Sequence, residues 1–233
     1  MSRIALFHNL KIATTNPAQQ SLRSVSHLTN IHTLIHSQLS SLTPNQKKQN
    51  RAPAPETQDQ GDVYVLTLQT DVVHQARMSE LRTQYFPAHL LKVNAHITLF
   101  HALPSSLLSI VIADLPSLSY SIPPFHIRAE APFRMARGIG VHVSGLGPLK
   151  KLFAQLQGRW WGYLTPQDRR RFKGHYTLMN KVDDRDAREM CLGELGREFT
   201  GCDGVASGLC LSRYDRGWWR YERNFRFSGV SAC

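Results

Sequence analysis

Apolar and polar positions follow a regular order from residue 62 onward. The apolar, β-branched segment 63–69 predicts a buried strand. Asp71 is suited to cap a helix, and apolar positions then recur at helical spacing up to residue 85. Pro87 ends this helix. Three more elements complete the first half: a strand at 94–102, a helix at about 105–114 and a strand at about 125–133.

The second half of the sequence repeats this order. It predicts a strand at 138–144, a helix at 148–161, a strand at 174–182, a helix from Asp183 to about 199, and a hairpin of strands at 205–214 and 218–227. Two copies are too few for a solenoid, so we expect an α+β fold with two pseudo-symmetric lobes of antiparallel sheet, outer helices and a central cleft. The lobes are predicted at about 61–135 and 136–228, and an exchange of strands between them is left open.

Each half carries a His-x-Thr triplet, His96-Ile97-Thr98 and His175-Tyr176-Thr177. Each triplet has a proline and a cation at matched upstream positions: Pro87 and Lys92 for the first, Pro166 and Arg171 for the second. One such triplet is a common accident, but two in matched surroundings predict a duplicated unit with two imidazoles at one site. Because alternate side chains of a strand share a face, each His is expected beside its Thr. Phe100 should share the face of His96, and His101 should take the opposite one.

Paired imidazoles with flanking hydroxyls suit acid–base cleavage of a phosphodiester, which needs a base for the attacking oxygen and an acid for the leaving one. Imidazole can do either, because its reference pKa of about 6.5 leaves both forms populated near neutrality. The threonine hydroxyls can donate to the non-bridging oxygens. We therefore predict His96, His175, Thr98 and Thr177 as catalytic residues, with no metal and no cofactor. Their matched surroundings do not say which His is the base. They predict a bell-shaped pH–rate profile with both pKa values near neutrality.

Four further residues are candidates for binding phosphate or substrate. Lys92, Arg171 and Lys173 could hold phosphate, although the run 169–171 is equally explained as a solvated surface turn. Trp218 could stack on a base, with core packing as the alternative. Three other histidines have no partner in the sequence and are interpreted as structural: His101, His126 and His142.

The composition narrows the class of protein and its partners. The chain has 233 residues and a formal net charge of +11, which favours polyanionic partners such as RNA ends or cyclic nucleotides. Its 4 cysteines have no CxxC spacing, which indicates a reducing compartment and disfavours a structural zinc site. No apolar run reaches the roughly 20 residues that span a bilayer, so no membrane partner is expected. We expect a monomer.

Residues 1–60 differ from the rest. They are basic, contain no acidic residue before Glu56, and end in a Pro/Ala segment at 51–56 that is typical of a linker. We predict a largely disordered arm outside a catalytic domain at 61–233. A basic, Ser-rich, acid-poor segment also fits a mitochondrial transit peptide. A cytoplasmic location is therefore expected, with a mitochondrial one as the alternative.

The segments His96-Ile-Thr-Leu-Phe100 and His175-Tyr-Thr-Leu-Met179 resemble the paired motifs of the two-histidine (2H) phosphoesterase superfamily, nearest to its 2′-5′ RNA ligase and cyclic phosphodiesterase type. The resemblance covers about residues 61–228. It implies a bilobal α+β fold and metal-independent acid–base action on 2′,3′-cyclic phosphate or 2′-5′ phosphodiester bonds, with RNA ligation as the reverse reaction. The family often has a proline before the second His, where this chain has Gly174. The alternative hypothesis is a non-catalytic RNA-binding protein with a basic cleft.

Overall fold

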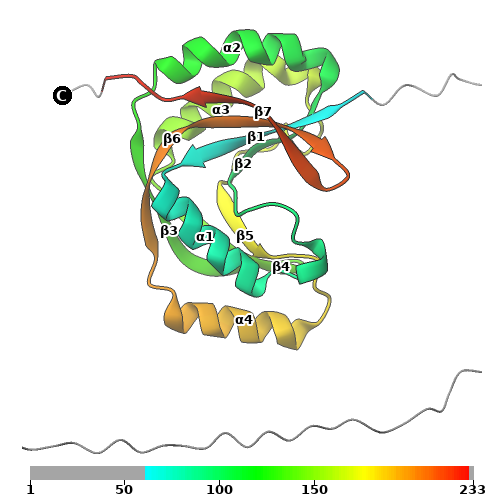
Figure 1. Ribbon diagram of the computed structural model, residues 1–233, viewed down its shortest axis with the longest axis vertical. Coiled ribbons are helices and arrows are strands. Elements are labelled where there is room, and N and C mark those ends of the chain that lie inside the picture. Colours follow the sequence, from blue (N-terminus) through cyan, green and yellow to red (C-terminus); the bar gives the residue numbers. More distant parts are fainter. Residues whose placement is uncertain (1–60, 231–233) are drawn as a thin grey trace, which may run out of the picture. The chain divides into compact units, whose positions relative to one another are not determined.

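A curved antiparallel sheet forms the centre of residues 61–230, the part of the chain that this computed structural model describes (Figure 1). The predictions for the arm at 1–60 lie outside these residues. The strands are β1 (Val63–Thr70), β2 (Thr98–Pro104), β3 (Phe125–Met135), β4 (Gly138–Ser144), β5 (His175–Met179), β6 (Cys202–Asp215) and β7 (Trp218–Arg226). The α-helices are α1 (Val72–Tyr85), α2 (Leu108–Tyr120), α3 (Gly147–Trp160) and α4 (Arg185–Glu198), with short 3-10 turns at Ala88–Leu90, Ser105–Leu107 and Trp161–Tyr163.

The order of the strands mixes the two halves of the sequence. The sheet runs β2-β1-β6-β3-β4-β5, and β7 pairs with β6. Every pairing is antiparallel. The late strand β6 lies between β1 and β3, with Leu66 opposite Leu211 and Ala129 opposite Cys202. The predicted α+β fold with an antiparallel sheet and outer helices is confirmed.

Helices also pack against strands from the other half of the sequence. Helix α1 follows β1 in the sequence but packs against β5 and β6. Helix α3 follows β4, yet its Phe153 and Trp160 rings lie 4.7 Å and 5.3 Å from the ring of Phe100 on β2. Helix α2 covers β7, and α4 covers β3 and β4. Each of the two strands that carry a His-x-Thr motif is therefore supported by a helix from the other half of the sequence.

Helix α1 forms where the sequence predicts it, and a polar residue on it enters the core. Asp71 caps the helix by accepting a hydrogen bond from the backbone N–H of His74 at 2.9 Å. The buried face comprises His74, Met78, Leu81 and Arg82. Inside the core, His74 Nε2 lies 3.0 Å from the hydroxyl of Tyr176 on β5. Because both groups are buried, this hydrogen bond satisfies two polar atoms that would otherwise be costly to bury.

Strand β2 departs from regular alternation. Its register with β1 pairs Tyr64 with Leu103, Leu66 with Phe100 and Thr67 with Thr98, so β2 uses one residue more than β1 at each of two steps. Such bulges rotate the following side chains. Leu99 and Phe100 are consequently both buried, while His101 is exposed. The expectation that Phe100 shares the face of His96 and that His101 takes the opposite face is wrong for this reason.

No helix within residues 61–230 has the length and apolar character needed to cross a membrane.

Candidate active site

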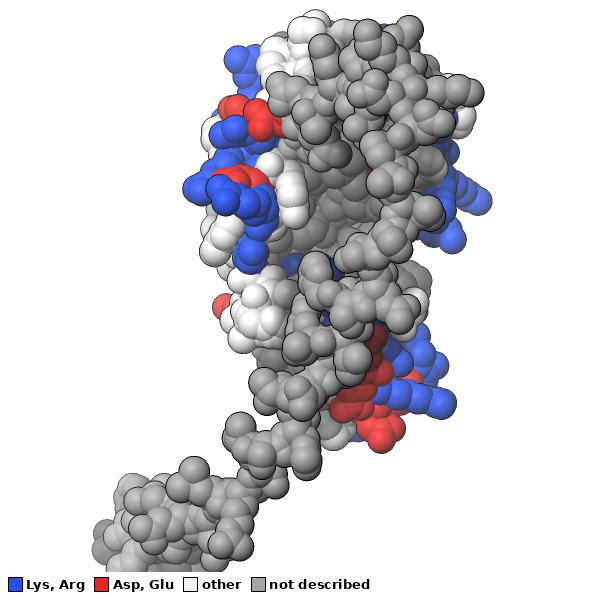
Figure 2. Space-filling view, turned by 90° about the vertical axis from the view of Figure 1, so that its right-hand side faces the viewer, with Lys and Arg blue, Asp and Glu red and all other residues white. Residues whose placement is uncertain are grey.

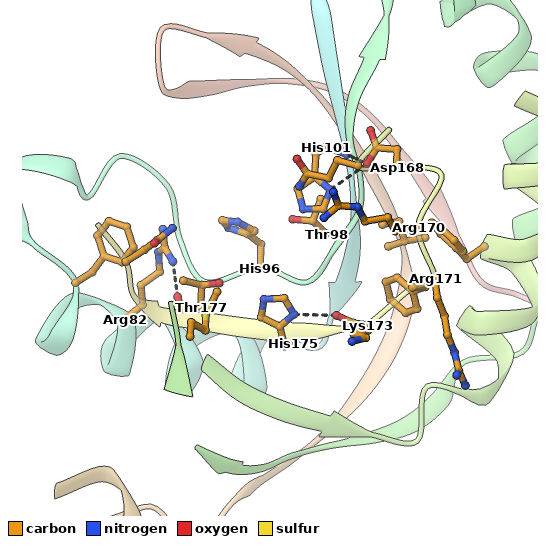
Figure 3. A pocket seen from close by; sticks show the side chains of 17 residues that line it. Arg82, His96, Thr98, His101, Asp168, Arg170, Arg171, Lys173, His175 and Thr177 are labelled. Carbon is orange, nitrogen blue, oxygen red and sulfur yellow. Dashed lines mark hydrogen bonds and ion pairs between the residues drawn. The ribbon is translucent and has the colours of Figure 1, made fainter. Parts of the chain in front are cut away.

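Both His-x-Thr motifs line one cavity of about 500 Å³ (Figure 3). His175 and Thr177 lie on β5, Thr98 begins β2, and His96 lies just before β2. The backbone N–H of Leu68 on β1 donates to the carbonyl of Ile97 at 2.9 Å, which fixes the segment that carries His96. Strands β2 and β5 are at opposite ends of the strand order, so it is the curvature of the sheet that brings the two motifs together.

The two imidazoles are held in the same way. His96 Nδ1 lies 2.7 Å from the carbonyl oxygen of Asn94, and His175 Nδ1 lies 2.8 Å from that of Lys173. A carbonyl oxygen only accepts, so each Nδ1 carries a hydrogen and donates it. Each Nε2 is left available for proton transfer. The repeated motif therefore fixes both the orientation and the tautomer of each ring.

The surroundings of the two histidines differ, although the sequence suggests matched ones. The ring of His96 lies 4.3 Å from that of Trp219 on β7, whereas the ring of His175 meets Phe133 edge-on at 5.7 Å. Burial lowers the pKa of His96 to about 4; the hydrogen bond to Asn94 opposes this, and the charges of neighbouring groups add to it. His96 is thus neutral near pH 7. The expectation that both histidines titrate near neutrality is wrong for His96.

Arg82 on α1 connects the two motif-bearing segments and lines the cavity. Its Nε donates to the carbonyl of Val93 at 3.1 Å, and its guanidinium also donates to the carbonyl of Thr177. The guanidinium covers the ring of Phe86 at 3.9 Å. Burial lowers the pKa of Arg82 to about 10, so the side chain keeps its positive charge near neutrality.

His101 and Asp168 form a pair that the sequence did not predict, and they lie at another part of the cavity wall. The Asp168 carboxylate is buried and accepts hydrogen bonds from the backbone N–H of His101 at 2.8 Å, from its Nδ1 at 3.0 Å and from the backbone N–H of Ala102 at 3.0 Å. Burial alone would raise the pKa of Asp168, but these hydrogen bonds hold it below its usual value. The structural interpretation of His101 did not include this partner.

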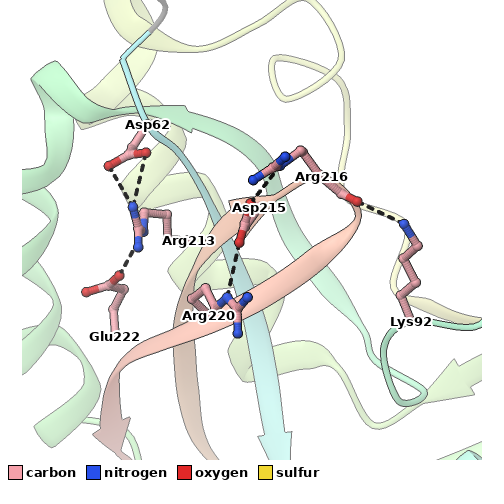
Figure 4. Close-up of polar contacts among 7 residues, drawn as sticks. All are labelled: Asp62, Lys92, Arg213, Asp215, Arg216, Arg220 and Glu222. Atoms are coloured by element: carbon pink, nitrogen blue, oxygen red, sulfur yellow. Dashed lines mark hydrogen bonds and ion pairs between the residues drawn. The ribbon is translucent and has the colours of Figure 1, made fainter.

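The structure places two of the four predicted substrate-binding residues in the cavity wall and two outside it. Arg171 and Lys173 line the cavity, and Lys92 and Trp218 are not among the residues that line it. Lys92 Nζ instead donates to the backbone carbonyl of Arg216 at 2.9 Å, at the tip of the β6–β7 hairpin (Figure 4). Trp218 is 52% exposed, and it is the adjacent Trp219 that contacts His96.

Comparison with known proteins decides the family. The model of the 2′-5′ RNA ligase superfamily matches residues 70–218. The chain belongs to the 2′-5′ RNA ligase superfamily. The resemblance to the 2H phosphoesterases that the two motifs suggest is thereby confirmed, and membership supports a phosphoesterase or RNA ligase-like enzyme.

A solved structure with a TM-score above 0.5 is similar to this chain in fold. A phosphoesterase is 12% identical with a TM-score of 0.52, over 72% of this chain and 99% of that one. TT0787 of Thermus thermophilus is 18% identical with a TM-score of 0.49, over 72% of this chain and 98% of that one. LigT of E. coli in its apo form is 14% identical with a TM-score of 0.49, over 72% and 98%. A search of curated proteins gives no match.

Among the site residues that the sequence analysis missed, Arg82 and Trp219 left weak signals in the sequence and Asp168 left none. Arg82 follows Met78 at i+4, so the helical pattern places it on the buried face, where an arginine needs a polar partner. Trp219 and Tyr221 share one face of β7 by alternation, and both line a second cavity that also contacts His96. Asp168 stands in a turn after Pro166, and nothing in its local sequence indicates that it is buried.

Proposed function

We propose that this protein is a metal-independent phosphodiesterase that cleaves 2′,3′-cyclic phosphate or 2′-5′ phosphodiester bonds in RNA ends or nucleotides, with RNA ligation as the reverse reaction. One observation carries the proposal. Two imidazoles line the same cavity, and each is tied through Nδ1 to a backbone carbonyl so that its Nε2 is free. Two such nitrogens supply the base and the acid that this cleavage requires.

Proton transfer can be followed atom by atom. In the resting enzyme His96 is neutral because burial lowers its pKa to about 4, so its Nε2 can accept the proton of the attacking oxygen. The attacking oxygen belongs to water when a cyclic phosphate is opened and to the neighbouring ribose hydroxyl when a 2′-5′ bond is cleaved. His175, when protonated, donates its Nε2 proton to the leaving oxygen. One P–O bond forms, one breaks, and the pair of histidines holds the same number of protons before and after. In the reverse of 2′-5′ bond cleavage, which joins a cyclic phosphate to a 5′-hydroxyl, the two roles are exchanged.

Negative charge on the phosphate can be stabilised by Thr98, Thr177 and Arg82. The hydroxyls of Thr98 and Thr177 line the cavity beside the two imidazoles and can donate to the non-bridging oxygens as negative charge builds up on them. Arg82 adds a fixed positive charge, and its hydrogen bonds to Val93 and Thr177 hold it in place before substrate arrives. Donors held in advance stabilise a transition state without the cost of reorganisation.

The test is a turnover screen in the presence of EDTA with 2′,3′-cyclic nucleotides, ADP-ribose 1″,2″-cyclic phosphate and 2′-5′-linked oligonucleotides. We expect turnover by the wild-type protein, and a loss of kcat of about 10²-fold or more in His96→Ala and in His175→Ala. His126→Ala is the matched control, because His126 is exposed on β3 and does not line the cavity. Loss of turnover in EDTA, or full activity in either single variant, would contradict the proposal.

The alternative, a non-catalytic RNA-binding protein, is favoured by the cations in the cavity wall, since Arg82, Arg170, Arg171 and Lys173 would also attract RNA. The same screen distinguishes the two functions. A binding protein would show no turnover of any substrate, and replacing both histidines by alanine would leave its affinity for RNA almost unchanged.

A further inference from the structure

The cavity extends beyond the two His-x-Thr motifs to a basic end. His101 and Arg170 line this end, and Figure 3 shows the side chain of Arg170 reaching toward His101 and Thr98, away from Arg82. The whole cavity, at about 500 Å³, falls within the usual range for pockets that enclose a complete small ligand, about 300–1000 Å³. A single phosphate group therefore leaves most of the cavity empty.

His101 is fixed with one nitrogen available to a ligand. Its Nδ1 donates to the buried carboxylate of Asp168 at 3.0 Å, so its Nε2 is the nitrogen left for the cavity. The side chain of His101 is 48% exposed, whereas that of Asp168 is fully buried. Asp168 therefore determines which nitrogen of the His101 ring faces the cavity.

The loop that carries Arg170 is fixed in the same region. Gln157 on α3 donates through Nε2 to the carbonyls of Asp168 at 3.0 Å and Arg170 at 3.1 Å. Thr165 lies 3.2 Å from the Asp168 carboxylate through its hydroxyl. The backbone at Arg170 is thus positioned before any ligand binds, which lowers the cost of ordering on binding.

In the part of the chain that the structure describes, the four cations of the cavity have no carboxylate partner, whereas several arginines elsewhere do. On the face seen in Figure 2, Asp and Glu side chains lie among many of the Lys and Arg side chains. At the β6–β7 hairpin, Asp215 pairs with Arg216 and Arg220, and Arg213 pairs with Asp62 and Glu222 (Figure 4). Within residues 61–230, by contrast, no ion pair is formed by the four cavity cations, Arg82, Arg170, Arg171 and Lys173.

This excess of positive charge is more than one phosphodiester can neutralise. A phosphodiester carries one negative charge, and Arg82 lies on the Thr177 side of the two catalytic histidines, where it can serve the group being cleaved. Arg170 and His101 lie on the Thr98 side. The one carboxylate among the residues that line the cavity, Asp168, is already occupied by backbone N–H groups and His101.

We propose that His101, held by Asp168, and Arg170 form a second anion subsite that binds a phosphate of the substrate other than the one being cleaved. The inference rests on the proposed function and specifies its substrate class. The preferred substrates are nucleotides or RNA ends that carry a further phosphate, and nucleosides with a lone cyclic phosphate are poorer substrates.

A binding experiment tests the subsite without requiring turnover. Calorimetry on the full-length protein compares adenosine 2′-phosphate with adenosine 2′,5′-bisphosphate. We expect the bisphosphate to bind about tenfold more tightly, which corresponds to about 1.4 kcal/mol. His101→Asn keeps a donor near the position of Nδ1 for Asp168 but removes Nε2, and Arg170→Gln replaces the guanidinium of an exposed side chain with a neutral amide. Each variant should lose most of the preference.

Arg197→Gln is the matched control, because it removes one exposed arginine from α4, outside the cavity, and should keep the preference. Equal affinities of the wild-type protein for the two ligands would overturn the subsite, as would a preference that survives in both subsite variants. Turnover of adenosine 2′,3′-cyclic phosphate with and without a 5′-phosphate separates the two proposals. If neither compound nor any other substrate of the EDTA screen is turned over, the proposed function fails, while the calorimetric preference still decides the subsite.

Discussion

Removal of the Trp219 ring should raise the pKa of His96. The two rings are 4.3 Å apart, and burial is the main reason that the pKa of His96 is about 4 instead of the usual 6.5. This difference corresponds to about 3 kcal/mol between the charged and neutral forms. Trp219→Ala opens one face of the imidazole to water, so we expect the pKa of His96 to rise by about 1 or more.

NMR titration of the imidazole resonances measures this pKa directly, and the pH dependence of kcat/KM reports its consequence. His96 acts from its neutral form, so a higher pKa moves the acid limb of the profile to higher pH. The stability of the folded protein also depends on the protonation of His96. The pKa of His96 is lower in the folded protein than in the unfolded chain. Its contribution is therefore fully present above about pH 6.5 and is lost as the pH falls from there to about 4.

Trp218→Ala provides the control, because the adjacent tryptophan is half-exposed and does not line the cavity. It should leave the titration of His96 unchanged. A wild-type His96 that titrates near 6.5, or a Trp219→Ala variant with no upward change, would refute the argument that burial sets this pKa.

Three further outcomes are expected. Arg82→Met should lower the free energy of unfolding in urea by about 3–5 kcal/mol, because the carbonyls of Val93 and Thr177 lose charged donors; a change below 1 kcal/mol would contradict this. Asp168→Asn should cost about 2–4 kcal/mol at pH 7 and flatten the loss of stability below about pH 3.8, since the lowered pKa of Asp168 makes its contribution disappear only in acid. A chain that begins at Gly61 should melt within a few degrees of the full-length protein by circular dichroism and keep its turnover, whereas failure to fold would move the domain boundary into residues 1–60.

Local patterns in the sequence predicted the helices and strands and identified the two His-x-Thr motifs. Alternation along β7 places Trp219 and Tyr221 on one face, and both line the second cavity, which His96 also borders. The cap at Asp71 and the strand position of His175 are also as expected. These features depend on residues a few positions apart, which periodicity and capping rules describe well.

The parts that the sequence did not predict depend on contacts between distant residues. The position of His101 follows from the bulges of β2 against β1, and alternation within β2 cannot reveal them. Asp168 becomes buried because its loop closes over the backbone of His101 and Ala102. The lowered pKa of His96 comes from burial, to which the hairpin contributes by placing Trp219 against its ring. The sequence analysis named the adjacent Trp218 as the candidate instead.

The position of β6 in the sheet has a consequence for synthesis on the ribosome. Strand β1 needs β6 as its neighbour, and the two are separated by most of the described sequence, as the pairing of Tyr64 with Arg213 shows. Such distant pairing carries a large loop-closure entropy and slows folding. The apolar residues of β1 emerge early and stay without this partner until the last part of the chain is translated. The growing chain therefore exposes an unpaired strand edge for most of its translation, and protection of that edge by a chaperone would raise the yield of folded protein.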